Sequence, residues 1–204
     1  MGVVDAVGWQ VVVAAIAAVV LVAIGSVGGF RSAVATVQKP LAVASVGSPV
    51  EVPPWQIELE SARQFDSAPQ IARQTDGVRY LAVTLYLTNT ASRFVPSGAA
   101  QPAVEALRID AAGLRDVRGP LAPEDARPTL YRLPDAVPVG AFQPGIRYRV
   151  VAVWQQDAAT PAPASLRITL RGSVYRASSL DGSMMWFPDD PVASGELPVV
   201  VGPP

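Results

Sequence analysis

The chain has 204 residues, contains neither Cys nor His, and carries 16 Lys and Arg against 17 Asp and Glu, for a formal net charge of -1. The two absences exclude a Ser-His-Asp triad, a thiol nucleophile, a disulfide and the Cys- or His-based metal sites. A nearly neutral chain also argues against nucleic-acid binding, which needs a basic surface. The composition therefore predicts neither a nucleic-acid partner nor chemistry based on imidazole or thiol groups.

The first distinct element is an uncharged run, residues 6–30, that lies between Asp5 and Arg31. As a helix this run would span about 37 Å, which exceeds the roughly 30 Å hydrocarbon core of a bilayer. Its apolar residues occupy every helical face, which favours a membrane span over a buried core helix. We predict an N-terminal anchor over residues 1–30, with one transmembrane helix at about 7–27.

A cleaved signal peptide is the alternative, because Ala33-Val34-Ala35 and Ala42-Val43-Ala44 match the small-x-small cleavage pattern. No Lys or Arg precedes the run, and the run is longer than a usual signal-peptide core, so we favour a retained signal anchor. The positive-inside rule, applied to Arg31 and Lys39, would place the rest of the chain in the cytoplasm. The rest of the chain resembles an exported β domain, which favours a location outside the cytoplasm. We expect a single-pass protein of the cytoplasmic membrane with an extracytoplasmic C-terminal domain.

Residues 31–49 are predicted to be a linker, because they are small and weakly polar and end in Gly47-Ser48-Pro49. From residue 50 to 204 the pattern changes to strict alternation of apolar and polar residues, which is typical of half-buried strands. Leu81, Val83, Leu85 and Leu87, for example, form one face of a strand. The predicted strands are 55–60, 80–88, 107–110, 129–133, 137–142, 146–154, 166–171 and 197–201.

Seven to eight short strands, separated by turns and accompanied by no long amphipathic helix, predict an all-β fold for residues 50–204. We expect an immunoglobulin-like antiparallel β-sandwich, and a small β-barrel is the alternative. Gln143-Pro144-Gly145 predicts a type II turn, in which the glycine takes a positive φ before the next strand.

Two segments resemble a known family. The strand 80–88 that ends in Asn89-Thr90, and Phe142-Gln143-Pro144-Gly145 leading to the strand with Trp154, are similar to motifs of bacterial exported or membrane-anchored immunoglobulin-like domains of unknown function. The resemblance covers about residues 50–175 and implies a fold and a cell-envelope setting, without a reaction. The chain lacks the Cys of a lipoprotein anchor, so the helix would have to anchor it.

Two groups of side chains are candidate partner surfaces. Met184-Met185-Trp186-Phe187 would form an apolar contact patch if exposed, or would plug one open end of the sandwich if buried. The second group would form a basic face if its strands are neighbours, and otherwise the ordinary solvated face of a sheet. This group consists of Arg147, Arg149, Arg167 and Arg171.

Asp189-Asp190, near Asp181, is the densest acidic cluster. Calcium needs about six to eight oxygen ligands, and this stretch lacks the spacing of an EF-hand, so we interpret it as a solvated loop. Met184-Met185 without Cys or His does not indicate a soft-metal site. We predict no catalytic residues, no metal and no cofactor.

These patterns predict a membrane-anchored cell-envelope protein with a non-catalytic interaction domain that contacts an unknown protein or envelope polymer. One alternative is an accessory subunit of a multispan membrane complex such as a transporter, because small residues in the run permit close helix packing. These residues are Ala14, Ala15, Ala17, Ala18 and Gly25. The other alternative is an envelope hydrolase that uses a pair of carboxylates.

Overall fold

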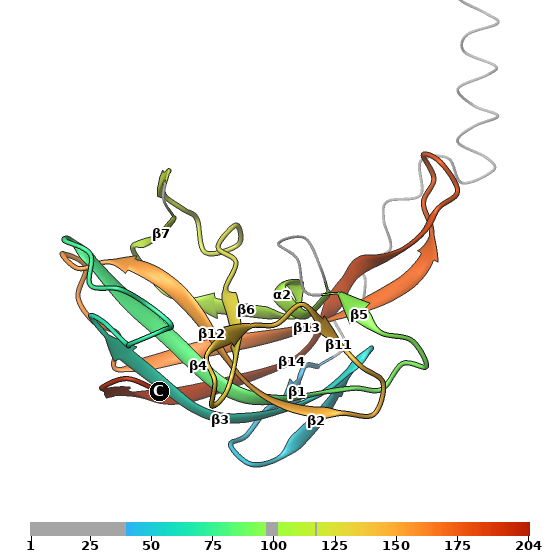
Figure 1. Cartoon of the computed structure of the whole chain (residues 1–204), viewed down its shortest axis with the longest axis horizontal. Helices are drawn as coiled ribbons and strands as arrows, with labels where there is room; N and C mark the ends of the chain where they lie inside the picture. Colours follow the sequence, from blue (N-terminus) through green and yellow to red (C-terminus); the bar gives the residue numbers. More distant parts are fainter. Residues whose placement is uncertain (1–39, 97–101, 117) are drawn as a thin grey trace, which may run out of the picture. The chain divides into compact units, whose positions relative to one another are not determined.

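Strands and the turns between them make up most of the described chain, which in this computed structural model comprises residues 40–96, 102–116 and 118–204 (Figure 1). The prediction of an all-β fold is confirmed. Within these residues the helical segment is one turn, α2 (Pro102–Glu105). The strands are β1 (Ala42–Val43), β2 (Pro49–Val52), β3 (Trp55–Phe65), β4 (Val78–Asn89), β5 (Val95–Pro96), β6 (Leu107–Asp110), β7 (Leu114–Asp116), β8 (Gly119–Pro120), β9 (Thr129–Arg132), β10 (Val137–Pro138), β11 (Ala141–Phe142), β12 (Arg147–Asp157), β13 (Ser165–Ala177) and β14 (Met184–Val201).

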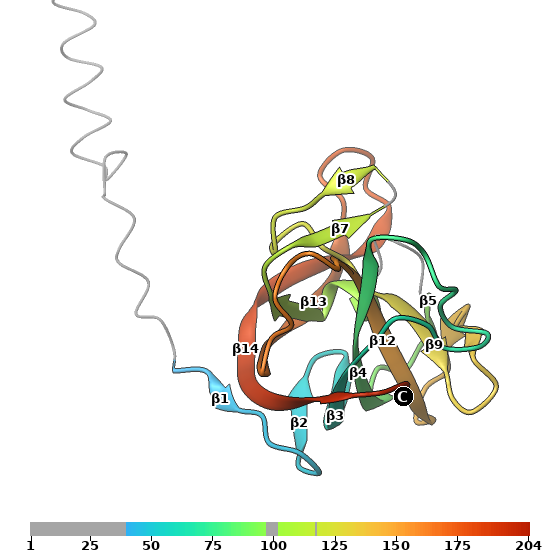
Figure 2. The same cartoon turned by 90° about the vertical axis from the view of Figure 1, so that its left-hand side faces the viewer.

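Eight of the strands form one hydrogen-bonded path in the order β10-β9-β12-β4-β3-β14-β13-β6. Strands β1, β2, β7 and β8 pair off this path, and β5 and β11 form a separate two-stranded sheet. Strand β14 links the two halves of the path: up to Pro198 it pairs with β13, and from Val199 to Val201 it runs parallel to β3. Buried side chains of β6 and β13 share one core with those of β3, β4 and β12. The sheet therefore folds into two packed layers around that core, and β14 curves from one layer to the other (Figure 2). Among the described strands the path is open, ending at β10 and β6.

The core confirms the alternation in β4, where Leu81, Val83, Leu85 and Leu87 are fully buried. The opposite face of β4 differs from the prediction of a half-buried strand, because Tyr80 and Ala82 are buried as well. A second, smaller cluster forms there, since the segment after β3 folds back over this face and the Tyr80 hydroxyl donates to the carbonyl oxygen of Arg73 at 2.9 Å. The alternation of apolar and polar residues in β4 does not predict that another segment covers its second face.

The two motifs that carry the resemblance contact each other at the end of β4. The Nδ2 group of Asn89 donates to the backbone oxygen of Phe142 at 3.0 Å, and the backbone oxygen of Asn89 accepts from the Gly145 N–H at 2.8 Å. Gly145 has φ +71°, as the predicted turn requires. Thr90 donates from both its N–H and its hydroxyl to the carbonyl oxygen of Pro54, at 2.8 and 2.9 Å. These bonds fix the turn that leads into β12.

The compact unit begins at Leu41, within the segment 31–49 that we predicted to be a linker. The boundary at residue 50 is therefore too late. Strand β1 runs parallel to β14, with Ala42 beside Ala193, and β2 pairs antiparallel with β3. The segment after β1 lies so close to β14 that a Cβ added at Gly195 would collide with the carbonyl oxygen of Ala44.

The predicted transmembrane helix at residues 7–27 lies outside the described residues. In the part of the chain that the structure describes, no helix is both long and apolar enough to cross a membrane.

Candidate functional site

The far end of the β13–β14 hairpin extends beyond the packed layers (Figure 1). Tyr175 pairs with Trp186 and Ala177 with Met184, and residues 178–183 close the loop. The loop is ordered by its own hydrogen bonds: the Ser178 N–H donates to the Ser183 carbonyl oxygen at 2.7 Å, and the Ser183 hydroxyl donates to the Asp181 carboxylate at 2.7 Å. The predicted patch 184–187 is therefore part of a strand, although the sequence indicated a strand only from 197.

The hairpin exposes apolar side chains on both faces. Leu180 is 96% exposed at the tip, Met184 is 53% and Met185 46% exposed, and Phe94, which lies beside the hairpin, is 59% exposed. Trp186 is half-buried against the edge of the core. We call this group the hairpin surface; it consists of Phe94, Val174, Tyr175, Leu180, Met184, Met185, Trp186 and Phe187.

Aromatic and cationic contacts hold the hairpin surface in place. The rings of Tyr175 and Trp186 lie 5.1 Å apart, and the Arg93 guanidinium lies 4.3 Å from the centre of the Tyr175 ring. Arg176 covers the ring of Phe187 in the same way, at 4.1 Å. Each such cation–π contact contributes about 0.5–1 kcal/mol at an exposed site. The exposed methionines thus lie on an ordered hairpin.

A hollow of about 410 Å³ lies between the hairpin and the segment around β5, and is lined by Arg93, Phe94, Pro96, Tyr175, Met184, Met185 and Trp186. Among the described residues the lining has no carboxylate, so it offers apolar and aromatic contact together with one guanidinium. This is a lining for apolar groups, and it lacks the acid and base that hydrolysis would need.

The predicted arginines do not form one face, because β4, β3 and β14 lie between β12 and β13 in the sheet. On β12, Arg147 forms an ion pair with Glu58 at 2.7 Å, and Arg149 donates from Nε to Glu60 at 2.8 Å. The hydrogen bond from Arg149 is the main cause that lowers the pKa of Glu60 below its usual value. Both arginines are therefore neutralised on their own sheet face.

The two arginines of β13 lie in the other half of the path. Arg171 donates to the carbonyl oxygen of Asp189 at 3.2 Å, and Arg167 lies in register with Asp110 on one side and Glu196 on the other. The condition for a single basic face, that the strands are neighbours, is therefore not met, and the alternative of ordinary solvated sheet faces applies. The charges are balanced locally in both halves, because Glu58 and Glu60 of β3 reach the arginines of β12 across β4, and Asp110 and Glu196 lie in register with Arg167.

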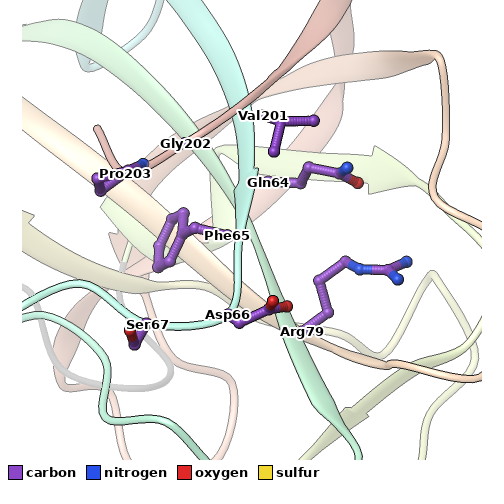
Figure 3. Close-up of a pocket in the computed structure, with 8 residues that line it drawn as sticks. All are labelled: Gln64, Phe65, Asp66, Ser67, Arg79, Val201, Gly202 and Pro203. Carbon is purple, nitrogen blue, oxygen red and sulfur yellow. The ribbon is translucent and has the colours of Figure 1, made fainter.

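A second hollow, of about 390 Å³, lies where the end of β14 meets β3 (Figure 3). It is lined by Gln64, Phe65, Asp66, Ser67, Arg79, Val201, Gly202 and Pro203. Arg79 is held by the carbonyl oxygens of Thr160 and Ala158, at 3.0 and 3.4 Å. Asp66 is the one carboxylate in this lining, whereas glycoside hydrolysis uses two. The hollow therefore does not supply the carboxylate pair of the hydrolase alternative.

The acidic stretch 181–190 uses its side chains locally. Hydrogen bonds from the Ser183 hydroxyl and N–H lower the pKa of Asp181, and the Asp189 carboxylate accepts from the Asp190 N–H at 2.9 Å. Within the described ranges, no three acidic side chains group closely enough to hold a metal ion.

One charged cluster was not predicted from the sequence. Glu105 forms ion pairs with Arg108 and Arg127, and Arg108 also donates to the carbonyl oxygens of Val104 and Leu107. Burial raises the pKa of Glu105, but the two arginines more than offset this and hold it below its usual value. The three-residue spacing of Glu105 and Arg108 was the available signal, although Arg108 lies in β6, beyond the end of α2. The cluster fixes α2 against β6, so its role is structural.

Together the fold and these surfaces define an all-β protein with an exposed apolar hairpin. No protein-family description matches the chain, and no curated protein matches it. Among solved structures, an uncharacterized β-sandwich protein from Clostridium difficile 630 is similar at 8% identity, with a TM-score of 0.42, over 75% of this chain and 97% of that chain.

Proposed function

We propose that the chain is a single-pass, membrane-anchored cell-envelope protein whose immunoglobulin-like β domain is a non-catalytic interaction module. The observation that carries the proposal is the hairpin surface, an ordered apolar group that extends past the core into solvent. Exposed apolar groups rimmed by polar residues mark interaction sites. The uncharged run 6–30 supports the anchor, because it is long enough to cross a bilayer.

The hairpin surface suits binding better than catalysis. Burial of an exposed Leu or Met side chain contributes about 1.5–3 kcal/mol, so Leu180, Met184 and Met185 could together supply several kcal/mol of binding free energy. The charged pairs of β12, in contrast, are exposed and neutralised, and such pairs contribute about 0–1 kcal/mol each. A contact at the hairpin would therefore contribute more binding free energy than a contact at the charged pairs of β12.

The test uses the lack of Cys in the native chain, which makes single-cysteine labelling free of background. Met184→Cys reports on the hairpin surface, and Val201→Cys, at the other end of β14 and 75% exposed, is the matched control. Full-length variants are labelled with a water-soluble maleimide in opened native membranes and again after solubilisation in detergent. We expect labelling at position 184 to be slowed at least about threefold in membranes, and labelling at 201 to be unchanged.

Equal labelling at position 184 in both states would show that nothing covers the hairpin and would overturn its role as a contact surface. Extraction of the chain from membranes by alkaline carbonate would overturn the anchor. Stoichiometric co-purification of a multispan protein would instead favour the accessory-subunit alternative, which the small residues of the run support.

A further inference from the structure

The direction in which the chain enters the β domain carries a further inference, which rests on the proposed function. Strand β1 runs parallel to β14, with Ala42 beside Ala193 and Val43 beside Ser194. Strand β1 therefore begins on the side of Pro191 and Asp190. That is the direction in which β14 leads back to Met184 and the hairpin tip.

The distance along β14 from the start of β1 to the hairpin is comparable with the reach of the chain that precedes the domain. At about 3.3 Å per residue, Met184 lies roughly 27 Å along β14 from Val192. Between Arg31, where the uncharged run has ended, and Pro40 the extended chain reaches at most about 35 Å. A domain on a tether of this length, entered from the hairpin side, can touch the membrane that holds residues 6–30 with its hairpin tip.

The chemistry of the hairpin surface fits a lipid interface. Leu180 is exposed at the tip, the two methionines follow it, and the amphipathic rings of Tyr175 and Trp186 lie further back. Apolar tips with Trp and Tyr behind them occupy the boundary between headgroups and acyl chains. Asp181, Asp189 and Asp190 balance the nearby arginines, so apolar insertion, and not attraction to anionic lipid, would drive the contact.

We propose that the hairpin surface inserts its tip into the lipid bilayer. The bilayer is thus the partner of the interaction module, and the domain is held against the membrane at two points. Two membrane attachments reinforce each other, because the first raises the effective concentration of the second.

The experiment places a fluorescent label on Leu180→Cys, Met184→Cys or the control Val201→Cys in the purified full-length chain. Each variant is reconstituted in nanodiscs of mixed phosphatidylcholine and phosphatidylglycerol, with and without brominated acyl chains. Because Leu180 is almost fully exposed, its replacement leaves the packing of the core unchanged. We expect brominated lipid to quench the labels at 180 and 184 at least about threefold more than the label at 201. Leu180→Asp should reduce the quenching at 184 toward the control value.

Equal quenching at all three positions would overturn the lipid contact. If position 184 were nevertheless shielded in native membranes, a protein would occupy the hairpin surface, so the proposed function would stand while this inference fails. Extraction of the chain by alkaline carbonate would instead overturn the membrane anchor, and with it the proposed function.

Discussion

Asn89 is the side chain at which a single substitution should have the clearest effect on the fold. It is fully buried at the end of β4 and uses its whole amide group. Its Nδ2 group donates to the carbonyl oxygens of Arg93 at 2.8 Å and Phe142 at 3.0 Å, and its Oδ1 atom accepts from the Ala91 N–H at 2.9 Å. Asn89→Ala would leave all three partners without this amide.

The expected loss follows from these contacts. The bonds to Arg93 and Ala91 are partly buried, so water can replace them in part and each contributes about 1 kcal/mol. The Phe142 carbonyl is buried, and leaving it unpaired costs about 2 kcal/mol. Asn89→Ala should therefore lower the free energy of unfolding by about 4 kcal/mol, a large part of the roughly 5–15 kcal/mol that stabilises a typical domain.

The assay is urea-induced unfolding of the full-length chain in a mild nonionic detergent, followed by the fluorescence of the buried Trp55 and Trp154. Asn89→Asp is the informative comparison, because it keeps the shape but cannot donate to the two carbonyl oxygens when ionised. It should be at least as destabilising as the Ala variant. Gln56→Ala, which removes an exposed hydrogen bond to Glu51, should change the value by less than about 0.5 kcal/mol. A loss below about 1 kcal/mol for Asn89→Ala would refute the reasoning.

Three other measurements test separate parts of the structure. Glu105→Gln should lower the urea midpoint at pH 7. Its arginine partners depress the pKa of Glu105 below 4.5, so the ionised carboxylate contributes fully to the free energy of unfolding above that pH. The difference from wild type should therefore vanish as the pH falls through the lower folded-state pKa. Gly195→Ala should speed hydrogen exchange in β1 and leave β4 protected, whereas Gly140→Ala, where a Cβ meets open space, should change neither; slow exchange in β1 of the first variant would contradict the close approach. A membrane-impermeant maleimide should label Val201→Cys on intact cells, and labelling only after lysis would place the domain in the cytoplasm.

The strands that sequence reasoning predicted well are those whose own side chains alternate across the core. In β3 the buried Trp55, Ile57 and Leu59 alternate with polar residues, and the strand extends from Trp55 to Phe65. The prediction failed for most of β14, where Pro188 and Pro191 interrupt any pattern. These prolines lie opposite Ser173 and Arg171, where the register with β13 shifts. The pairing with β13, and not a local pattern, makes this segment a strand.

The candidate site was predictable in part for a related reason. The patch 184–187 was visible in the sequence because four large apolar residues follow a polar stretch. Leu180 and Phe94 were missed, because their exposure depends on how far the hairpin extends and on where the segment before β5 packs. The pairing of Arg147 with Glu58 was equally hidden, since the two residues meet only when β12 and β3 lie on either side of β4.

The distribution of polar and apolar contacts gives the domain two different ends. Around the end of β4, buried hydrogen bonds of Asn89 and Thr90 fix the turns, so substitutions there should affect stability. At the hairpin the backbone is ordered by its own pairing, and the loop hydrogen bonds do not involve the apolar side chains. Because Leu180 and Met184 add little to the packing, Leu180→Asp should leave the unfolding free energy within about 0.5 kcal/mol of wild type. A change of binding without a change of stability would therefore separate a contact surface from a structural one, which is the distinction that the proposed function requires.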